Sequence, residues 1–292
     1  MRVGSNVPAT FGVLDEHDDI LTPDALLQQV GALVAGGFEH VELLGDFMSY
    51  DPEVYSASTV ESLNQMRSDH GVTFSIHAQN SLCVAIDSLE ERVRQASVEA
   101  VLTLYESLAP LGIQCVVFHS MWAQRTTLQV DQSALPDKAK FAVMSRVAEQ
   151  TARSLRELCR HIDSRAICQE NLGIDFDWVD RLVEEFDTSI CFDGGHWCIL
   201  GNDLLDFVRR YGSRVASVHC HDVKNGIDHQ PLEEDLTLPW FEALQALRAK
   251  QFDGPVVLEV KSVANSLASH ATLQRIVKSI DLDTPAGTDR TD

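Results

Sequence analysis

The segment that decides the fold runs from Arg165 to His196 and reads RAICQENLGIDFDWVDRLVEEFDTSICFDGGH. Two short runs rich in apolar residues, Arg165–Glu170 and Ser189–Asp193, lie on either side of a stretch with helical character, Asp175–Phe186. Short, near-continuous apolar runs are typical of strands that are buried on both faces, as in parallel sheets. We therefore interpret this segment as a strand–helix–strand unit of a parallel sheet.

The same unit repeats along nearly the whole chain. Six further runs are expected to be strands: Arg2–Asn6, His40–Leu44, Val72–His77, Ile113–His119, Val215–His221 and Pro255–Val260. The other expected helices are Thr22–Ala35, Thr59–Asp69, Ser88–Gly112, Asp137–His161, Asp203–Tyr211, Pro239–Lys250 and Val263–Ile280. Eight such units predict an α/β fold, a (β/α)8 TIM barrel, which typically needs about 250 residues plus loops. A doubly wound open sheet is the alternative, but no glycine-rich fingerprint follows the first strand.

We expect one domain over residues 1–280. Residues 281–292 contain four Asp and one Arg without any aromatic residue, and we expect this acidic tail to be disordered. No apolar run approaches the roughly 18 residues that a membrane span needs. The N-terminus lacks the apolar core of a signal peptide, and the seven cysteines form no CxxC pair, so we expect reduced thiols and a cytoplasmic protein.

The charge balance argues against a partner that carries negative charge. The 292 residues include 23 Lys and Arg against 44 Asp and Glu, a formal net charge of −21. Nucleic acids are bound mainly through Lys and Arg at phosphates, and anionic membranes attract basic segments. We therefore expect neither nucleic acid nor membrane as a partner, while homo-oligomerisation stays open.

Polar side chains finish six consecutive strands of the predicted barrel. These residues are His77, His119, Glu170, Asp193, His219 with His221 two residues later, and Glu259. Carboxylates and imidazoles are rare in apolar runs because burying them unpaired is costly. The C-terminal ends of barrel strands converge on one mouth, where active sites lie, so these side chains should meet in space. Mixed oxygen and nitrogen ligands of this kind suit Mn, Co, Mg or Zn.

Each residue also has a structural interpretation. A single His at a strand end is more often a structural residue, and a lone Asp before a helix is more often an N-cap. Repetition on six successive strands favours the metal cluster. For Glu42, His221 and His229, a structural role and a role in the site are equally compatible with the sequence.

The ordered set Glu170, Asp193-Gly-Gly-His196, His219-x-x-Asp222 and Glu259 resembles the xylose-isomerase-like TIM barrels. This superfamily includes sugar-phosphate isomerases and epimerases, keto-sugar 3-epimerases, inosose isomerases and dehydratases, and the endonuclease IV DNA-repair enzymes. The resemblance implies that Glu170, Asp193, His219 and Glu259 bind one divalent ion. It also implies that Glu170 and Glu259 move a proton on either side of a keto sugar, sugar phosphate or cyclitol, through a cis-enediolate.

Two alternatives share this scaffold. An inosose-type dehydratase would pass through the same enediolate and then expel hydroxide. A zinc-dependent hydrolase of the endonuclease IV type would use further zinc ions, for which His77 and His119 are candidate ligands together with Glu170. The third zinc of those enzymes uses an Asp-x-His pair, where this chain has Ile227-Asp228-His229. Glu233-Glu234-Asp235 adds negative charge near the mouth, which disfavours DNA as a substrate.

Several residues near the mouth are candidates for substrate contacts. The resemblance places His196 beside substrate oxygens next to the metal, and His77 and His119 can contact substrate if they bind no second metal. We also expect His221, Lys224, His229 and Trp122 in the binding site, although Lys224 is equally compatible with a solvated loop and Trp122 with core packing. The expected partner is a small polyol or keto sugar.

Overall fold

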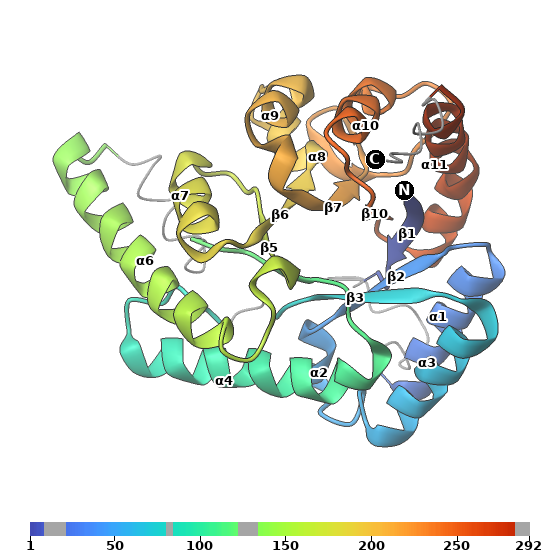
Figure 1. Ribbon diagram of the computed structural model, residues 1–292, viewed down its shortest axis with the longest axis horizontal. Coiled ribbons are helices and arrows are strands. Elements are labelled where there is room, and N and C mark those ends of the chain that lie inside the picture. The colour runs from blue at the N-terminus through green and yellow to red at the C-terminus, as the bar shows by residue number, and fades with distance from the viewer. Residues whose placement is uncertain (9–21, 80–83, 122–133, 284–292) are drawn as a thin grey trace, which may run out of the picture.

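The structure, a computed structural model, describes residues 1–8, 22–79, 84–121 and 134–283. Eight parallel strands close into a barrel in the order β1-β10-β7-β6-β5-β4-β3-β2, and the helices form a ring around them (Figure 1). The barrel strands are β1 (Arg2–Asn6), β2 (His40–Leu44), β3 (Thr73–His77), β4 (Val116–Phe118), β5 (Ile167–Glu170), β6 (Ser189–Asp193), β7 (Val215–Cys220) and β10 (Pro255–Leu258). The predicted (β/α)8 TIM barrel is confirmed.

Eight helices follow the strands as the sequence predicted. They are α1 (Pro23–Ala35), α3 (Ala57–His70), α4 (Glu91–Leu108), α6 (Asp137–Leu158), α7 (Asp177–Phe186), α9 (Leu204–Tyr211), α10 (Trp240–Ala249) and α11 (Val263–Asp283). Their ends have local causes. The Thr22 side chain accepts a hydrogen bond from the backbone N–H of Ala25 at the start of α1. Gly71 ends α3 with φ +71°, a left-handed conformation that costs glycine little.

Some predicted bounds were wrong by one to three residues. Strand β4 is shorter at both ends than the expected run, so that His119 lies just past it, and β10 ends before Glu259. Short 3₁₀ turns, η3 (Ser164–Ala166) and η4 (Gly212–Arg214), precede β5 and β7. Helix α11 continues to Asp283, so the first three residues of the expected tail are helical, and residues 284–292 lie outside the described part of the chain.

The sequence did not predict two helices and a hairpin at the carboxyl ends of the strands. Helix α2 (Asp46–Tyr50) follows β2, and α8 (Gly194–Ile199) begins directly after Asp193, the last residue of β6. An antiparallel hairpin of β8 (Asp222–Lys224) and β9 (Ile227–Gln230) follows β7. Its turn residues Asn225 and Gly226 have φ +54° and +73°, the pattern of a type I′ turn.

The apolar core lies mainly between the strands and the surrounding helices, where Leu33, Phe74, Phe192 and Trp240 are fully buried. The barrel interior is different in character. It holds a small cluster of Cys115, Val117, Cys168 and Cys191, together with buried polar residues, among which are His40, Glu42, Ser75 and His219. Buried polar groups need hydrogen-bond or ionic partners, so these side chains mark the part of the barrel in which a functional site is expected.

Two expectations about the chain as a whole can be compared with the described residues. Cys115, Cys168, Cys191 and Cys220 are buried free thiols, while Cys159 and Cys198 are partly exposed free thiols and Cys83 lies outside the described ranges. Across the described residues we find no helix with the length and apolar character of a membrane span.

Candidate metal centre at the barrel mouth

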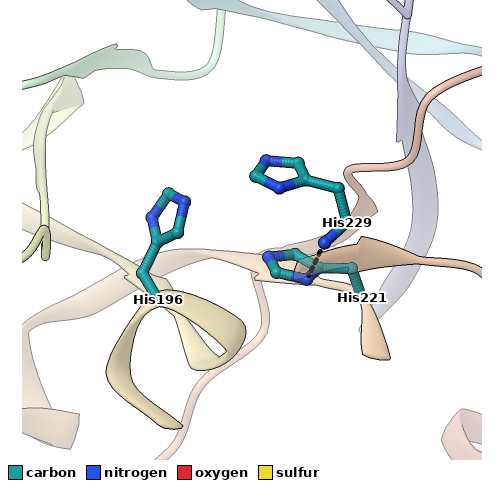
Figure 2. Close-up of side chains that lie close together, drawn as sticks. All are labelled: His196, His221 and His229. Carbon is teal, nitrogen blue, oxygen red and sulfur yellow. Dashed lines mark hydrogen bonds between the residues drawn. The ribbon is translucent and has the colours of Figure 1, made fainter. Parts of the chain in front are cut away.

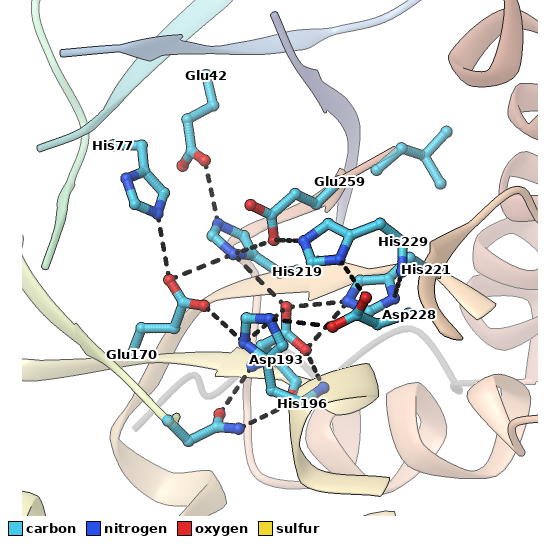
Figure 3. A network of polar contacts seen from close by, with 12 residues as sticks. Glu42, His77, Glu170, Asp193, His196, His219, His221, Asp228, His229 and Glu259 are labelled. Carbon is cyan, nitrogen blue, oxygen red and sulfur yellow. Dashed lines mark hydrogen bonds and ion pairs between the residues drawn. The ribbon is translucent and has the colours of Figure 1, made fainter. Parts of the chain in front are cut away.

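Four adjacent strands bring the predicted ligands together at one end of the barrel. Glu170, Asp193 and His219 lie on β5, β6 and β7, and Glu259 follows β10. The strand register pairs Asp193 with His219, and pairs Val257, two residues before Glu259, with the same His219. Residues of like parity on a strand face the same side, so all four side chains point into the mouth (Figure 3).

His219 is the centre of this group. Its Nδ1 lies 3.0 Å from a Glu259 oxygen, 3.6 Å from a Glu170 oxygen and 3.9 Å from an Asp193 oxygen. One donor atom from each of the four residues can be chosen so that all lie within 4.8 Å of one another. Four donor residues gathered this closely could hold one cation.

Three further histidines surround Glu170. His77 Nε2 and His119 Nε2 lie 3.3 and 3.2 Å from one Glu170 oxygen, and His196 Nδ1 lies 3.1 Å from the other. The Nδ1 of His77 is 3.0 Å from its neighbouring carbonyl, that of Ala78. A hydrogen bond donated to that carbonyl leaves Nε2 free to face the carboxylate or a metal ion.

The Gly194-Gly195 pair makes room for the residues behind Asp193. The Nε2 of His221 lies 3.1 Å from an Asp193 oxygen. A Cβ on Gly195 would lie only 1.9 Å from Cε1 of His221, and one on Gly194 would lie 2.3 Å from Trp240. The absence of side chains therefore allows α8 to pass over the His221 ring, while the Asp193 carboxylate caps the helix by accepting from the His196 N–H at 2.6 Å.

The β8–β9 hairpin contributes His229 to a second group of histidines, which also contains His196 and His221 (Figure 2). His229, in β9, stacks on His221 with ring centroids 4.5 Å apart, and its backbone N–H donates to His221 Nδ1 at 2.9 Å. The neighbouring Asp228 contacts His229 at 3.2 Å and reaches His196 at 4.0 Å. Donor atoms of His196, His221 and His229 also lie within 4.8 Å of one another.

Charge in the cluster is shared between carboxylates and imidazoles. Burial disfavours the charged form of Glu170 and Glu259, yet their histidine neighbours hold the pKa of each well below its usual range. His119 and His219 have this effect on Glu170, and His219 and His229 on Glu259. Burial also opposes protonation of His77 and His196, but the neighbouring carboxylates outweigh it and raise the pKa of each to about 9. The carboxylates therefore attract positive charge to the mouth.

Buried atoms at the centre lack well-formed hydrogen bonds. Within the described residues these are both Glu170 oxygens, both His219 ring nitrogens, His196 Nδ1, one Glu42 oxygen and one Glu259 oxygen, although all lie within ion-pair distance of a partner. Buried polar atoms without hydrogen bonds are costly and rare. A donor set of three carboxylates and one imidazole fits a divalent cation, which would satisfy the Glu170 and Glu259 oxygens and Nδ1 of His219.

Comparison with known proteins agrees with the barrel fold. A model of the xylose isomerase-like TIM barrel family matches residues 30–280. The chain belongs to this family. A solved structure of a D-tagatose 3-epimerase-like protein covers 97% of the chain and 99% of its own, with a TM-score of 0.72 and 19% identity. The IolI protein, solved with a bound zinc atom, covers 97% of each chain with a TM-score of 0.63 and 14% identity.

This xylose isomerase-like chain is also similar in sequence to two curated proteins. The uncharacterized protein MJ1311 of Methanocaldococcus jannaschii is 22% identical over 90% of this chain and 88% of its own. An inosose dehydratase of Geobacillus thermodenitrificans is 32% identical over 94 residues, which cover 30% of each chain.

In this xylose isomerase-like barrel, the structure gathers most of the residues that the sequence singled out. The clustered residues are His77, His119, Glu170, Asp193, His196, His219, His221, His229 and Glu259. Lys224 forms a 2.6 Å ion pair with Glu233. Trp122 lies outside the described residues.

Two contributors were missed by sequence reasoning. Asn171 forms two hydrogen bonds with the backbone of Asp193. Its Oδ1 accepts from the Asp193 N–H at 2.8 Å, and its Nδ2 donates to the Asp193 carbonyl at 2.7 Å. Its position directly after Glu170 was the available signal. The sequence comparison with an Asp-x-His pair gives Asp228 no role of its own, although the Asn225-Gly226 turn signal indicates a hairpin that would carry it.

Proposed function

We propose that this protein is a divalent-metal-dependent isomerase or epimerase that acts on a keto sugar, sugar phosphate or cyclitol. The observation that carries the proposal is the placement of Glu170 and Glu259 at the two ends of an arc of four adjacent strands, with Asp193 and His219 between them. Two carboxylates on either side of a bound substrate can remove and return a proton at the same carbon.

The two glutamates would perform the proton transfers. Their low pKa values leave both as carboxylates at neutral pH, so either can accept the proton from the carbon beside a carbonyl. A divalent cation held by Glu170, Asp193, His219 and Glu259 would supply a Lewis acid for the charge that develops on the substrate oxygens. The substrate would pass through a cis-enediolate before the proton returns.

The histidines around Glu170 would orient this base and the substrate. His77, His119 and His196 all lie within 3.3 Å of its two oxygens, which restricts the carboxylate to one orientation. His119 and His196 are also partly exposed, so their rings can reach hydroxyl groups of a polyol. Near-attack positioning of this kind accounts for much of enzymatic rate enhancement.

The pairing of Lys224 bears on the substrate class. Its ammonium group is 2.6 Å from a Glu233 oxygen, and a substrate phosphate would have to compete with that carboxylate. The contact favours an uncharged keto sugar or cyclitol over a sugar phosphate. Glu233→Gln tests this preference. Because it removes the charge that pairs with Lys224, it should lower the KM for phosphorylated substrates.

Solvent deuterium exchange tests the proposal. The protein, loaded with Mn or Co, is incubated in D2O with a panel of keto sugars and cyclitols, and NMR detects deuterium at the carbon beside the carbonyl. We expect incorporation with the wild type and none with Glu259→Gln, while the exposed Glu184→Gln should behave as the wild type. Absence of exchange with the whole panel at full metal occupancy would count against proton-transfer chemistry.

An inosose-type dehydratase is a second candidate, favoured by the local likeness to the Geobacillus thermodenitrificans enzyme. It would share the proton abstraction by a glutamate and differ in the fate of the enediolate, which would lose hydroxide. The product would be an unsaturated ketone that absorbs in the near ultraviolet. Absorbance growth with a cyclitol ketone would assign the lyase, and recovery of an isomeric ketone without absorbance would assign the isomerase.

A zinc hydrolase is favoured by a different observation, the two further donor groups at the mouth. His77, His119 and Glu170 form one group, and His196, His221 and His229 form the other (Figure 2). Metal analysis separates the candidates, because one ion per chain supports the isomerase and two or three zinc ions support the hydrolase. The residue at the expected Asp position, Ile227, is exposed and apolar, which weakens the hydrolase proposal.

A further inference from the structure

A row of polar side chains in contact with one another, here called the polar file, runs through the barrel interior away from the candidate metal centre. It begins at Nε2 of His219, which lies 3.1 Å from a Glu42 oxygen (Figure 3). The other Glu42 oxygen accepts a hydrogen bond from Ser75 at 3.0 Å, and the same Ser75 hydroxyl lies 2.9 Å from His40 Nε2. His219, Glu42, Ser75 and His40 are all fully buried.

The polar file continues to the opposite end of the barrel. His40 Nδ1 lies 2.8 Å from the Thr73 hydroxyl, which accepts a hydrogen bond from the Arg2 guanidinium at 3.3 Å. Burial, with a smaller effect from Arg2, lowers the pKa of His40 to about 3, so that its ring is neutral and carries a single N–H. A neutral imidazole must donate through one nitrogen and accept through the other.

The directions of the hydrogen bonds follow from these counts. The single proton of Ser75 goes to Glu42, so Ser75 must accept from His40 Nε2. His40 Nδ1 then accepts from the Thr73 hydroxyl, in preference to the longer 3.3 Å contact of that hydroxyl with the Glu39 carbonyl. All donors therefore point toward Glu42. Its remaining oxygen forms no well-formed hydrogen bond in this structure, but His219 Nε2 faces it at 3.1 Å, and an ionised carboxylate can only act as the acceptor in that contact.

The geometry points to Glu42 as a positioning residue that fixes the ring orientation and tautomer of His219, with Ser75 and His40 holding its carboxylate in place. A proton on Nε2 leaves the lone pair of a neutral His219 ring on Nδ1, the nitrogen that faces Glu170, Asp193 and Glu259. Carboxylates behind metal-binding histidines orient them and raise their basicity. This role rests on the proposed function, because it presupposes a cation at His219.

The test measures metal affinity rather than turnover. Zn²⁺ or Co²⁺ is titrated into the metal-free full-length protein in competition with a chelator of known affinity. We expect Glu42→Leu to weaken binding by about 10- to 100-fold. Glu42→Gln should lose less metal affinity. Its amide oxygen can still accept from His219, and its amide N–H can donate to Ser75 if the Ser75 hydroxyl donates to His40 instead. Gln169→Leu, which removes a buried amide bonded to Thr188, is the matched control and should bind as the wild type.

A second readout detects the tautomer directly. Long-range ¹H–¹⁵N spectra of the zinc-loaded protein should show His219 protonated at Nε2, with the resonance assigned by its loss in His219→Gln. Protonation at Nδ1, or an unchanged affinity in Glu42→Leu, would overturn the role of Glu42. If Glu42→Leu does not fold, Ser75→Ala replaces it and should weaken binding several-fold; affinity equal to that of the wild type would overturn the inference. Failure of the wild type to bind any metal would instead contradict the proposed function.

Discussion

Glu170 ends β5 and Glu259 directly follows β10, the strands at the two ends of a four-strand arc, yet both approach the same atom. Their carboxylate oxygens lie 3.6 and 3.0 Å from Nδ1 of His219. Like charges brought this close in a buried site repel each other unless positive charge lies between them. The relationship explains why the pKa values of His77 and His196 are raised despite their burial, and why the site suits a cation.

Replacement of either glutamate should separate chemistry from folding. Glu259→Gln and Glu170→Gln keep side-chain volume but remove the base, and we expect each to lower kcat by at least about 100-fold. Circular dichroism and thermal unfolding should show a folded protein in both cases. Activity near the wild-type level in Glu259→Gln would remove this residue from the proton-transfer pair.

Gly195→Ala should disturb the metal centre through His221. The added Cβ would lie 1.9 Å from the His221 ring, which must then move away from Asp193. We expect a loss of about 1–3 kcal/mol in the free energy of unfolding, together with weaker metal binding. Gly31→Ala is the matched control, because its nearest neighbour atom would be 4.0 Å away in the middle of α1. That change should stabilise the protein by about 0.5–1 kcal/mol, and equal effects at the two positions would refute the steric argument.

His40 should make folding stability depend on pH. Its pKa is about 3 in the folded protein, whereas an unfolded chain binds a proton near the usual value of 6.5. Below that value the unfolded state binds the extra proton, so this contribution to stability is lost as the pH falls toward 3. Between pH 7 and 5 the loss amounts to about 2 kcal/mol.

Denaturant titrations of the wild type and His40→Gln at both pH values measure this contribution as a difference. The comparison is needed because the histidines at the mouth have raised pKa values and act in the opposite direction. The variant should lack the His40 part of the dependence. Identical pH profiles for the two proteins would show that His40 is protonated or solvated in the folded state.

His229→Ala distinguishes one metal ion from three. Its Nε2 lies 3.7 Å from Glu259, but His229 is not among the four residues around His219. With a single ion, we expect activity to fall by less than about tenfold and the metal content to stay the same. Loss of one metal equivalent together with all activity would support the hydrolase proposal.

Sequence reasoning identified the residues whose signal is local. Eight apolar runs with intervening helices predicted the barrel, and the polar ends of six strands predicted the cluster. The C-terminal ends of parallel strands must converge in a closed barrel, so Glu170 and Glu259 could be brought together without knowledge of a single contact.

The remaining features depend on tertiary packing and could not be read from the chain. The contact between Gly195 and His221 joins α8 to the end of β7, and the order of Glu42, Ser75 and His40 depends on the register of β2 with β3. A one-residue shift of that register would turn these side chains to the other face. Exact strand ends, such as the end of β4 before His119, also depend on hydrogen bonds to neighbouring strands.

Anomalous diffraction from crystals soaked with Mn²⁺, Co²⁺ or Zn²⁺ tests the central claim most directly. We predict an anomalous peak within bonding distance of Glu170, Asp193, His219 and Glu259, and loss of that peak in His219→Gln. A map with no peak among these four residues at saturating metal would contradict the assignment of the cluster as a metal centre, and with it the proposed metal-dependent chemistry.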